Sequence, residues 1–318
     1  MDTARNVDKA AYGINTYSFT HTLRARDCLE YLANLGYRRF EIMLGPGHFW
    51  PRLDGDGGRQ EIASLVARDS LQILSLNQPN LDVNLSSIVP EMREHSCAVI
   101  ASAIELAASW NATGVVINPG KCNPVLPAPT ETLTDCFRRS LEALLPVARR
   151  AGVQLIVKNH PLSYLYRAND LRHFFDAFGW DQVGIGYDFA SGHFAGEEAE
   201  AVLQLRDHLL FMYVADTSLD VFTHAQIGTG TVAFEAIATM LREADLCVPT
   251  ILEIVAQNPE FAIDASVERL ESIRVADHID RKLTSELATM ITSALACGTS
   301  SSGLRRKPGR GLRPGQVP

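Results

Sequence analysis

The chain has 318 residues, of which 46% are hydrophobic and 21% are charged, the balance of an ordinary globular protein. Its 29 Lys and Arg against 37 Asp and Glu give a formal net charge of −8, which argues against nucleic acid as a partner. No apolar run reaches the roughly 18 residues of a membrane-spanning helix, and residues 1–13 lack the apolar core of a signal peptide. The six cysteines form no Cys-x-x-Cys pair, so we expect reduced thiols and a cytoplasmic protein.

Eight short apolar runs predict buried β-strands. Their near-continuous apolar character is typical of parallel strands that helices cover. In chain order the runs are Tyr12–Ser18, Arg39–Leu44, Leu71–Asn77, Thr113–Asn118, Val153–Asn159, Val183–Asp188, Leu209–Ala215 and Pro249–Val255.

Segments with helical spacing lie between these runs. Leu133–Arg150 carries its leucines on one face and ends in two arginines followed by Gly152, a pattern that favours a helix C-terminus. Phe234–Glu243 is a second helix, and a third is expected at about 263–295. Strands that alternate with helices predict βα units around a parallel sheet.

Eight βα units over about 250 residues fit a closed (β/α)8 TIM barrel, an α/β fold. We expect a single barrel domain over residues 12–296. A doubly wound open sheet is the alternative, but no Gly-x-Gly-x-x-Gly turn follows the first strand. Residues 298–318 are rich in Gly, Ser, Pro and Arg and are expected to form a disordered basic tail that folding does not require.

Polar residues gather where the predicted strands end, which is where barrels of this kind carry their chemistry. Lys158, Asp188 and Glu253 each interrupt an apolar strand, and a buried charge is costly unless it is paired. Two interpretations stay open: an ion-pair network that plugs the barrel, or a polar site for a small hydroxylated or carbonyl substrate. His48-Phe49-Trp50, after the second strand, is either an apolar lid or a loop packed on the barrel rim.

Five motifs in this order resemble the xylose-isomerase-like TIM-barrel superfamily, which includes sugar-phosphate isomerases and epimerases and the family 2 AP endonucleases. The resemblance covers about residues 12–256 and implies a barrel with, usually, one divalent metal at its mouth. The motifs are Val157-Lys158-Asn159-His160-Pro161, Gly186-Tyr187-Asp188, Tyr213-Val214-Ala215-Asp216, Ile227-Gly228-Thr229-Gly230 and Leu252-Glu253.

The resemblance implies four metal ligands: a Glu ending strand five, an Asp ending strand six, a His in strand seven and a Glu in strand eight. Asp188 and Glu253 match two of them, whereas Lys158 stands in place of the Glu and Tyr213 in place of the His. We therefore expect no cofactor. The weaker alternative is a loosely bound Mn²⁺, Mg²⁺ or Zn²⁺ held by Asp188, Glu253 and His224.

The expected function is that of an isomerase- or epimerase-like enzyme that transfers protons next to a carbonyl of a small polyhydroxylated or keto substrate. Isomerisation, epimerisation and dehydration all fit this chemistry. The alternative is a non-catalytic barrel that binds a ligand or partner after losing its metal site, and a homodimer is compatible with either function. The expected catalytic residues are Lys158, Glu253, Asp188 and His160, and the expected substrate-binding residues are Gln78, Asn118, Tyr213, His193 and Trp50.

Overall fold

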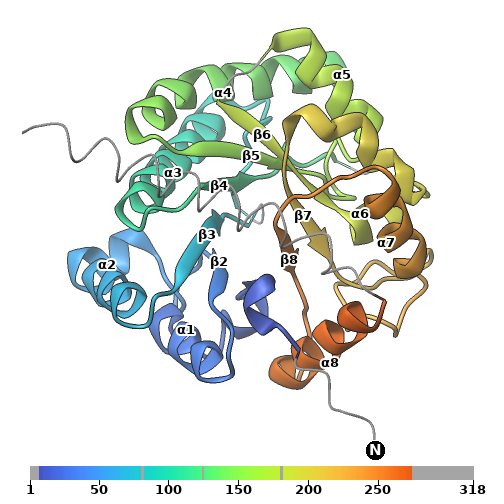
Figure 1. The fold of residues 1–318 in the computed structure, drawn as a ribbon. Coiled ribbons are helices and arrows are strands. Elements are labelled where there is room, and N and C mark those ends of the chain that lie inside the picture. The colour runs from blue at the N-terminus through green and yellow to red at the C-terminus, as the bar shows by residue number, and fades with distance from the viewer. Residues whose placement is uncertain (1–6, 80–81, 124, 180–181, 274–318) are drawn as a thin grey trace, which may run out of the picture. The chain divides into compact units, whose positions relative to one another are not determined.

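The computed structural model describes residues 7–79, 82–123, 125–179 and 182–273. In this part of the chain, parallel strands β1 to β8 close into a barrel in sequence order, and β1 pairs with both β2 and β8. Helices surround the strands (Figure 1). The predicted α/β TIM barrel is confirmed, and the open sheet is excluded because the first and last strands are hydrogen-bonded to each other.

All eight predicted strands are present, and β6 has the predicted bounds. The others are shorter because their flanking residues bond to loops; the Val255 amide, for example, donates to the His224 carbonyl oxygen. The observed strands are β1 Gly13–Asn15, β2 Arg39–Met43, β3 Gln72–Asn77, β4 Gly114–Ile117, β5 Gln154–Lys158, β6 Val183–Asp188, β7 Leu209–Val214 and β8 Thr250–Leu252.

The helices follow the predicted alternation. The α-helices are α1 Ala25–Asn34, α2 Pro51–Arg68, α3 Pro90–Ser109, α4 Thr130–Ala151, α5 Ala168–Phe178, α6 Phe189–Phe194, α7 Phe234–Glu243 and α8 Pro259–Ser272. Short 3₁₀ segments are η1 Lys9–Ala11, η2 Tyr17–Phe19 and η3 Ala199–His208. The helix expected at 263–295 corresponds to α8 in its described part, whereas its remainder and the tail at 298–318 lie outside the described residues.

The barrel interior is packed solid by a buried cluster from β3, β4, β5, β7 and β8. Its members are Leu74, Val116, Ile156, Phe211, Tyr213 and Ile251. Because these side chains fill the centre, a ligand can reach only the side chains at the strand ends and in the loops beyond them. None of the described helices has the length and apolar character that crossing a membrane requires.

Candidate functional site

Four ionisable side chains meet at the C-terminal ends of β5 to β8, and we call them the mouth cluster: Lys158, Asp188, His224 and Glu253. The Lys158 Nζ forms an ion pair with Glu253 and lies 3.4 Å from the Asp188 Oδ2. The His224 Nε2 lies 2.9 Å from the same Asp188 oxygen and 4.0 Å from the Glu253 Oε2. The three charges that interrupt predicted strands are thus brought together, although 95 sequence positions separate Lys158 from Glu253.

The mouth cluster is closed. Lys158 and Glu253 are each 4% exposed and Asp188 is fully buried. Opposite charges therefore satisfy one another in a setting of low dielectric constant, where an unpaired charge would be very costly. This pairing matches the ion-pair plug, one of the two interpretations that the sequence left open.

Mutual attraction outweighs burial in setting these protonation states. Burial opposes a charge on Lys158, but Glu253 and Asp188 raise the pKa of its amine above the ordinary value. Burial likewise opposes a charge on His224, and the same two carboxylates raise its pKa. Although burial disfavours the Asp188 carboxylate, Lys158 and His224 hold the pKa of its carboxyl far below the usual range. Lys158 is thus an ammonium at neutral pH, able to donate hydrogen bonds and unable to act as a base.

Asp188 is held by a full set of hydrogen bonds. Its Oδ1 accepts from the backbone N–H groups of Ala190 and Ser191 at 2.9 and 3.3 Å. Its Oδ2 accepts from the Ser191 hydroxyl and lies within hydrogen-bond distance of the His224 Nε2, both at 2.9 Å. A carboxylate offers about four lone-pair sites, so these four hydrogen bonds, with the Lys158 ammonium at 3.4 Å, occupy its capacity.

Metal binding is the obvious test of this cluster. Donor atoms of Asp188, His224 and Glu253 lie within 4.8 Å of one another, a spacing compatible with a shared metal ion. However, the Lys158 ammonium already lies against both carboxylates, and the lone pairs of Asp188 are committed. A divalent cation would have to share two carboxylates with a positive charge that they themselves stabilise. As arranged, these residues do not fit a divalent metal ion.

A buried carboxyl group that we did not predict, Glu41 of β2, supports the cluster through Tyr213. The Tyr213 hydroxyl donates to Glu41 at 2.7 Å, and its ring centroid lies 4.2 Å from the Lys158 Nζ, a cation–π contact. Burial and the charge of Glu253 raise the pKa of Glu41. The same carboxyl group also accepts from Asn15 Nδ2 at 2.6 Å, Asn77 Nδ2 at 2.9 Å and the Ser75 hydroxyl at 2.5 Å. A sequence signal existed, because Glu41 interrupts an apolar strand as Asp188 does.

His160 lies beside the cluster. Its Nδ1 accepts a hydrogen bond from the Leu162 backbone N–H at 3.2 Å, and its ring packs edge-on against Phe222 with centroids 5.5 Å apart. Burial and the positive charge of Lys158 lower the pKa of His160 to about 4. At neutral pH the ring is therefore uncharged, and because Nδ1 accepts, the proton sits on Nε2, which can donate.

Three of the residues expected to bind substrate are absent from the lining of the cavity that is described next. Tyr213 is fully buried, and its hydroxyl is held by Glu41. The His193 Nε2 bonds with the Thr231 hydroxyl at 2.8 Å, and Asn118 is half-buried with a buried Oδ1 that has no hydrogen-bond partner among the described residues. None of the three lines the cavity described next, so their roles in binding stay predictions.

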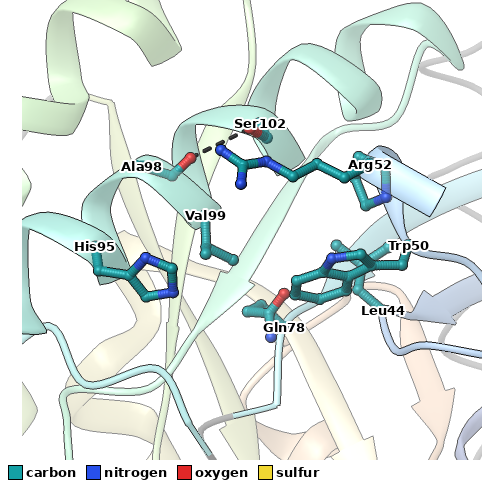
Figure 2. A pocket seen from close by; sticks show the side chains of 9 residues that line it. Leu44, Trp50, Arg52, Gln78, His95, Ala98, Val99 and Ser102 are labelled. Carbon is teal, nitrogen blue, oxygen red and sulfur yellow. Dashed lines mark hydrogen bonds between the residues drawn. The ribbon is translucent and has the colours of Figure 1, made fainter. Parts of the chain in front are cut away.

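A cavity opens between the loops that follow β2 and β3 and the helices α2 and α3. We call the part beside Arg52 and Ser102, of about 130 Å³, the inner part, and the part that extends to Tyr17 and Asp82, of about 270 Å³, the outer part. The two parts share Leu44, Trp50, Gln78, His95 and Val99, and Figure 2 shows these five side chains around one space. Trp50 and Gln78, both expected to bind substrate, line this cavity, whereas the α3 residues carry no motif that could have identified them.

The loop after β2 was expected to be either an apolar lid or a loop packed on the barrel rim, and its residues differ in this respect. His48 is buried, with its Nε2 at 2.9 Å from the Thr16 hydroxyl, and Phe49 packs against Trp110 with ring centroids 4.9 Å apart. Both residues therefore pack on the barrel rim. Trp50 is only half-buried and lines the cavity.

Tyr17 lies between the cavity and the strand end that carries Glu253, because the hydroxyl of the next residue, Ser18, donates to the Ile254 carbonyl oxygen at 2.8 Å. It lies in η2, directly after β1, and lines the outer part of the cavity. Partial burial and the charge of Glu253 raise the pKa of its phenol, while the charge of Lys158 acts in the opposite direction. Its hydroxyl group therefore stays protonated at neutral pH.

Solved structures of similar fold include several sugar-modifying enzymes. A D-tagatose 3-epimerase-like protein aligns with a TM-score of 0.71 at 20% identity, covering 83% of this chain and 98% of that protein. The 3-keto-D-glucoside 4-epimerase YcjR from E. coli aligns with a TM-score of 0.69 at 20% identity, covering 83% of this chain and all of that one. At these identities the likeness establishes the fold.

Two curated relatives come from Methanocaldococcus jannaschii. The uncharacterized protein MJ1614 is 25% identical over 203 residues, which are 63% of this chain and 76% of that protein. The uncharacterized protein MJ1188 is 29% identical over 201 residues, which are 63% of this chain and 61% of that protein. The family pattern described as a xylose isomerase-like TIM barrel matches residues 29–273. The chain therefore belongs to the xylose isomerase-like TIM-barrel family.

Proposed function

We propose that this protein is an isomerase- or epimerase-like enzyme that moves a proton at a carbon next to a carbonyl group, without a divalent metal. Its substrate is a small polyhydroxylated or keto compound. The observation that carries the proposal is the Lys158 ammonium, held between Glu253 and Asp188 at the strand end where the resemblance implies a metal ligand.

Lys158 acts as the electrophile. When a proton leaves the carbon next to a carbonyl, negative charge develops on the carbonyl oxygen, and a preorganised cation stabilises that charge. Because Glu253 and Asp188 keep the pKa of Lys158 high, the amine stays protonated through the step. The same protonation argues against a Schiff base, which requires a neutral amine.

Glu253 acts as the base. A carbonyl oxygen that binds the Lys158 ammonium displaces Glu253, which frees a carboxylate beside the reacting carbon. The proton moves from carbon to Glu253, the bonding electrons form an enediolate, and Lys158 and the Nε2–H of His160 stabilise its oxygens. A single carboxylate returns the proton to the same face, which suits transfer between neighbouring carbons better than inversion at one carbon.

The non-catalytic alternative has an observation in its favour. The cluster is buried and paired, and Asp188 has no lone pair to spare. A cluster with a purely structural role would look the same, and the barrel would then bind its ligand in the cavity beside it. Proton exchange at carbon separates the two functions, because only an enzyme produces it.

The test is incorporation of solvent deuterium into a panel of aldoses, ketoses and keto acids, followed by NMR in D₂O. We expect the wild-type chain to label at least one substrate next to its carbonyl. Lys158→Met should slow labelling by roughly 10²–10³-fold, the usual cost of removing one oxyanion donor. Lys9→Met is the matched control, because Lys9 pairs with Asp264 away from the mouth cluster.

Three outcomes would contradict parts of the proposal. Normal labelling by Lys158→Met would show that the ammonium is not catalytic. One tightly held metal ion per chain, lost on Asp188→Asn, would contradict metal independence. No labelling of any substrate by the folded wild-type protein would favour the non-catalytic barrel.

A further inference from the structure

We infer that the cavity beside the mouth cluster is a binding site for the distal ring of a two-part, glycoside-like substrate. The reacting part would lie at Tyr17, whose neighbour Ser18 bonds to the backbone directly after Glu253, and the second ring would lie in the inner part between α2 and α3. Only the assignment of the reacting part rests on the proposed function, since ring binding does not require catalysis.

The size of the cavity supports two parts. The inner part, of about 130 Å³, is close to the roughly 150 Å³ of an engineered protein cavity that holds one benzene molecule. It therefore has space for a ring about the size of benzene, with the ring's substituents directed into the adjoining outer part. The outer part, of about 270 Å³, shares five lining residues with the inner part and reaches Tyr17.

Gln78 supplies the polar contact at the centre of the cavity. It lines both parts and is only 6% exposed. Its Nε2 donates to the Pro79 carbonyl oxygen at 3.2 Å, whereas its buried Oε1 has no hydrogen-bond partner among the described residues. A buried acceptor without a partner is costly, and a ligand hydroxyl that donates to this oxygen would remove that cost.

The remaining lining matches a sugar ring. Figure 2 shows the Trp50 indole beside Gln78, with Val99 and His95 across the space. Trp50, Leu44 and Val99 present apolar surface to the C–H face of a ring, whereas Arg52 and His95 present polar groups to its hydroxyls. Among the described residues, no carboxylate lines the inner part, so it contains no acidic group that would select a cation. The inner part thus combines apolar surface with a few polar groups, as small-molecule sites commonly do, and a ring with hydroxyls on its edge matches both.

The experiment measures binding by calorimetry with the full chain. The probes are cellobiose, maltose, lactose and trehalose, together with glucose and galactose as single rings. We expect at least one disaccharide to bind tenfold or more tightly than its component monosaccharides. Val99→Phe fills the inner part and should weaken disaccharide binding at least tenfold, with little change for monosaccharides. Val89→Phe, at an exposed position preceding the same helix, is the matched control.

Gln78→Leu provides a second variant in case Val99→Phe misfolds. It keeps the volume of the side chain, removes the unpaired oxygen and should weaken disaccharide binding about tenfold. Melting curves confirm that each variant is folded. The inference is overturned if no disaccharide binds, if glucose or galactose binds as tightly as the disaccharides, or if Val99→Phe affects both classes equally.

Repeating the titrations with Lys158→Met separates this inference from the proposed function. Disaccharide binding that survives in Lys158→Met and depends on Val99 supports the ring site even when no variant labels a substrate with deuterium. Labelling of monosaccharides without any disaccharide binding supports the enzyme and rejects the ring site. Indole serves as a further probe. If indole binds to the wild type but not to Val99→Phe, and no sugar binds to either, the cavity takes an aromatic ligand and the sugar-ring site is rejected.

Discussion

Two histidines at the barrel mouth show how neighbouring charges decide protonation at the residue scale. His160 and His224 both lose solvation, and burial disfavours the imidazolium form of each. At His224, the carboxylates of Glu253 and Asp188 more than offset the effect of burial and raise the pKa. At His160, the Lys158 ammonium adds to the effect of burial, and together they lower the pKa to about 4. Identical side chains on the loops after β5 and β7 therefore differ in how readily they take up a proton.

The lowered pKa of His160 predicts a pH dependence of folding stability. The unfolded chain binds a proton at this ring near pH 6.5, but the folded chain does so only near pH 4, so the folded state loses stability as the pH falls between these values. His160→Asn keeps an acceptor for the Leu162 N–H and removes the titration. In urea unfolding at pH 7 and pH 4.5, the wild type should lose more stability than His160→Asn. The control is His173→Gln at an exposed position, and equal losses in wild type and His160→Asn would contradict the prediction.

Local backbone signals position the elements that carry the site. The Trp50 backbone N–H donates to the Asp54 carboxylate at 2.7 Å, which ties the start of α2 to the residue that lines the cavity. Elsewhere around the barrel, α4 buries its leucine face and ends at Gly152, which adopts a left-handed φ of 68° as the sequence pattern predicted. Helix ends of this kind depend on residues within one turn, so they are visible in the sequence.

The C-terminus of α4 provides a test at the element scale. Gly152→Ala should lower the free energy of unfolding by about 1 kcal/mol, because a Cβ is disfavoured in the left-handed region. Gly57→Ala should raise it by up to about 0.5 kcal/mol, since Gly57 follows the kink at Gly55 in α2, lies outside the left-handed region and has open space where a Cβ would lie. Both values come from urea unfolding. A Gly152→Ala variant as stable as the wild type would contradict the role of Gly152 as a helix cap.

At the scale of the whole barrel, one buried cluster joins strands from both halves of the sequence. Ile156 of β5 and Phe211 of β7 pack with side chains of β3, β4 and β8 in the centre. The same closure brings the ends of β5 and β8 to one mouth, which lets Lys158 and Glu253 meet. The site therefore depends on the integrity of the entire barrel.

Truncation of the central cluster should destabilise the whole barrel. Phe211 is 2% exposed, and Phe211→Ala should cost about 3–5 kcal/mol of unfolding free energy through lost burial and a residual cavity. Phe261→Ala is the matched control, because Phe261 is 70% exposed and its loss should cost less than about 0.5 kcal/mol. Urea unfolding followed by circular dichroism measures both. A small effect for Phe211→Ala would show that the barrel centre is less tightly packed than its burial indicates.

The sequence by itself determined the eight strands, the alternating helices and the barrel, because apolar periodicity and helix-end signals are local. It also marked Lys158, Asp188 and Glu253, since a charge inside an apolar strand is visible without a structure. The predicted bounds of most strands were too long because loop hydrogen bonds replace strand pairing at their ends.

Only the tertiary structure decided which partner each charge has. Lys158 and Glu253 are 95 positions apart in the sequence. Whether the pKa of Lys158 is raised or lowered depends on neighbours that come close only when the barrel closes. Glu41 was missed as the support of Tyr213 for the same reason, although it too interrupts a strand. His95 and Val99 look like ordinary helix residues in the sequence, and they line a cavity only because α3 packs beside the loops after β2 and β3. Local patterns encode elements, whereas a site made of distant side chains exists only once those elements have packed.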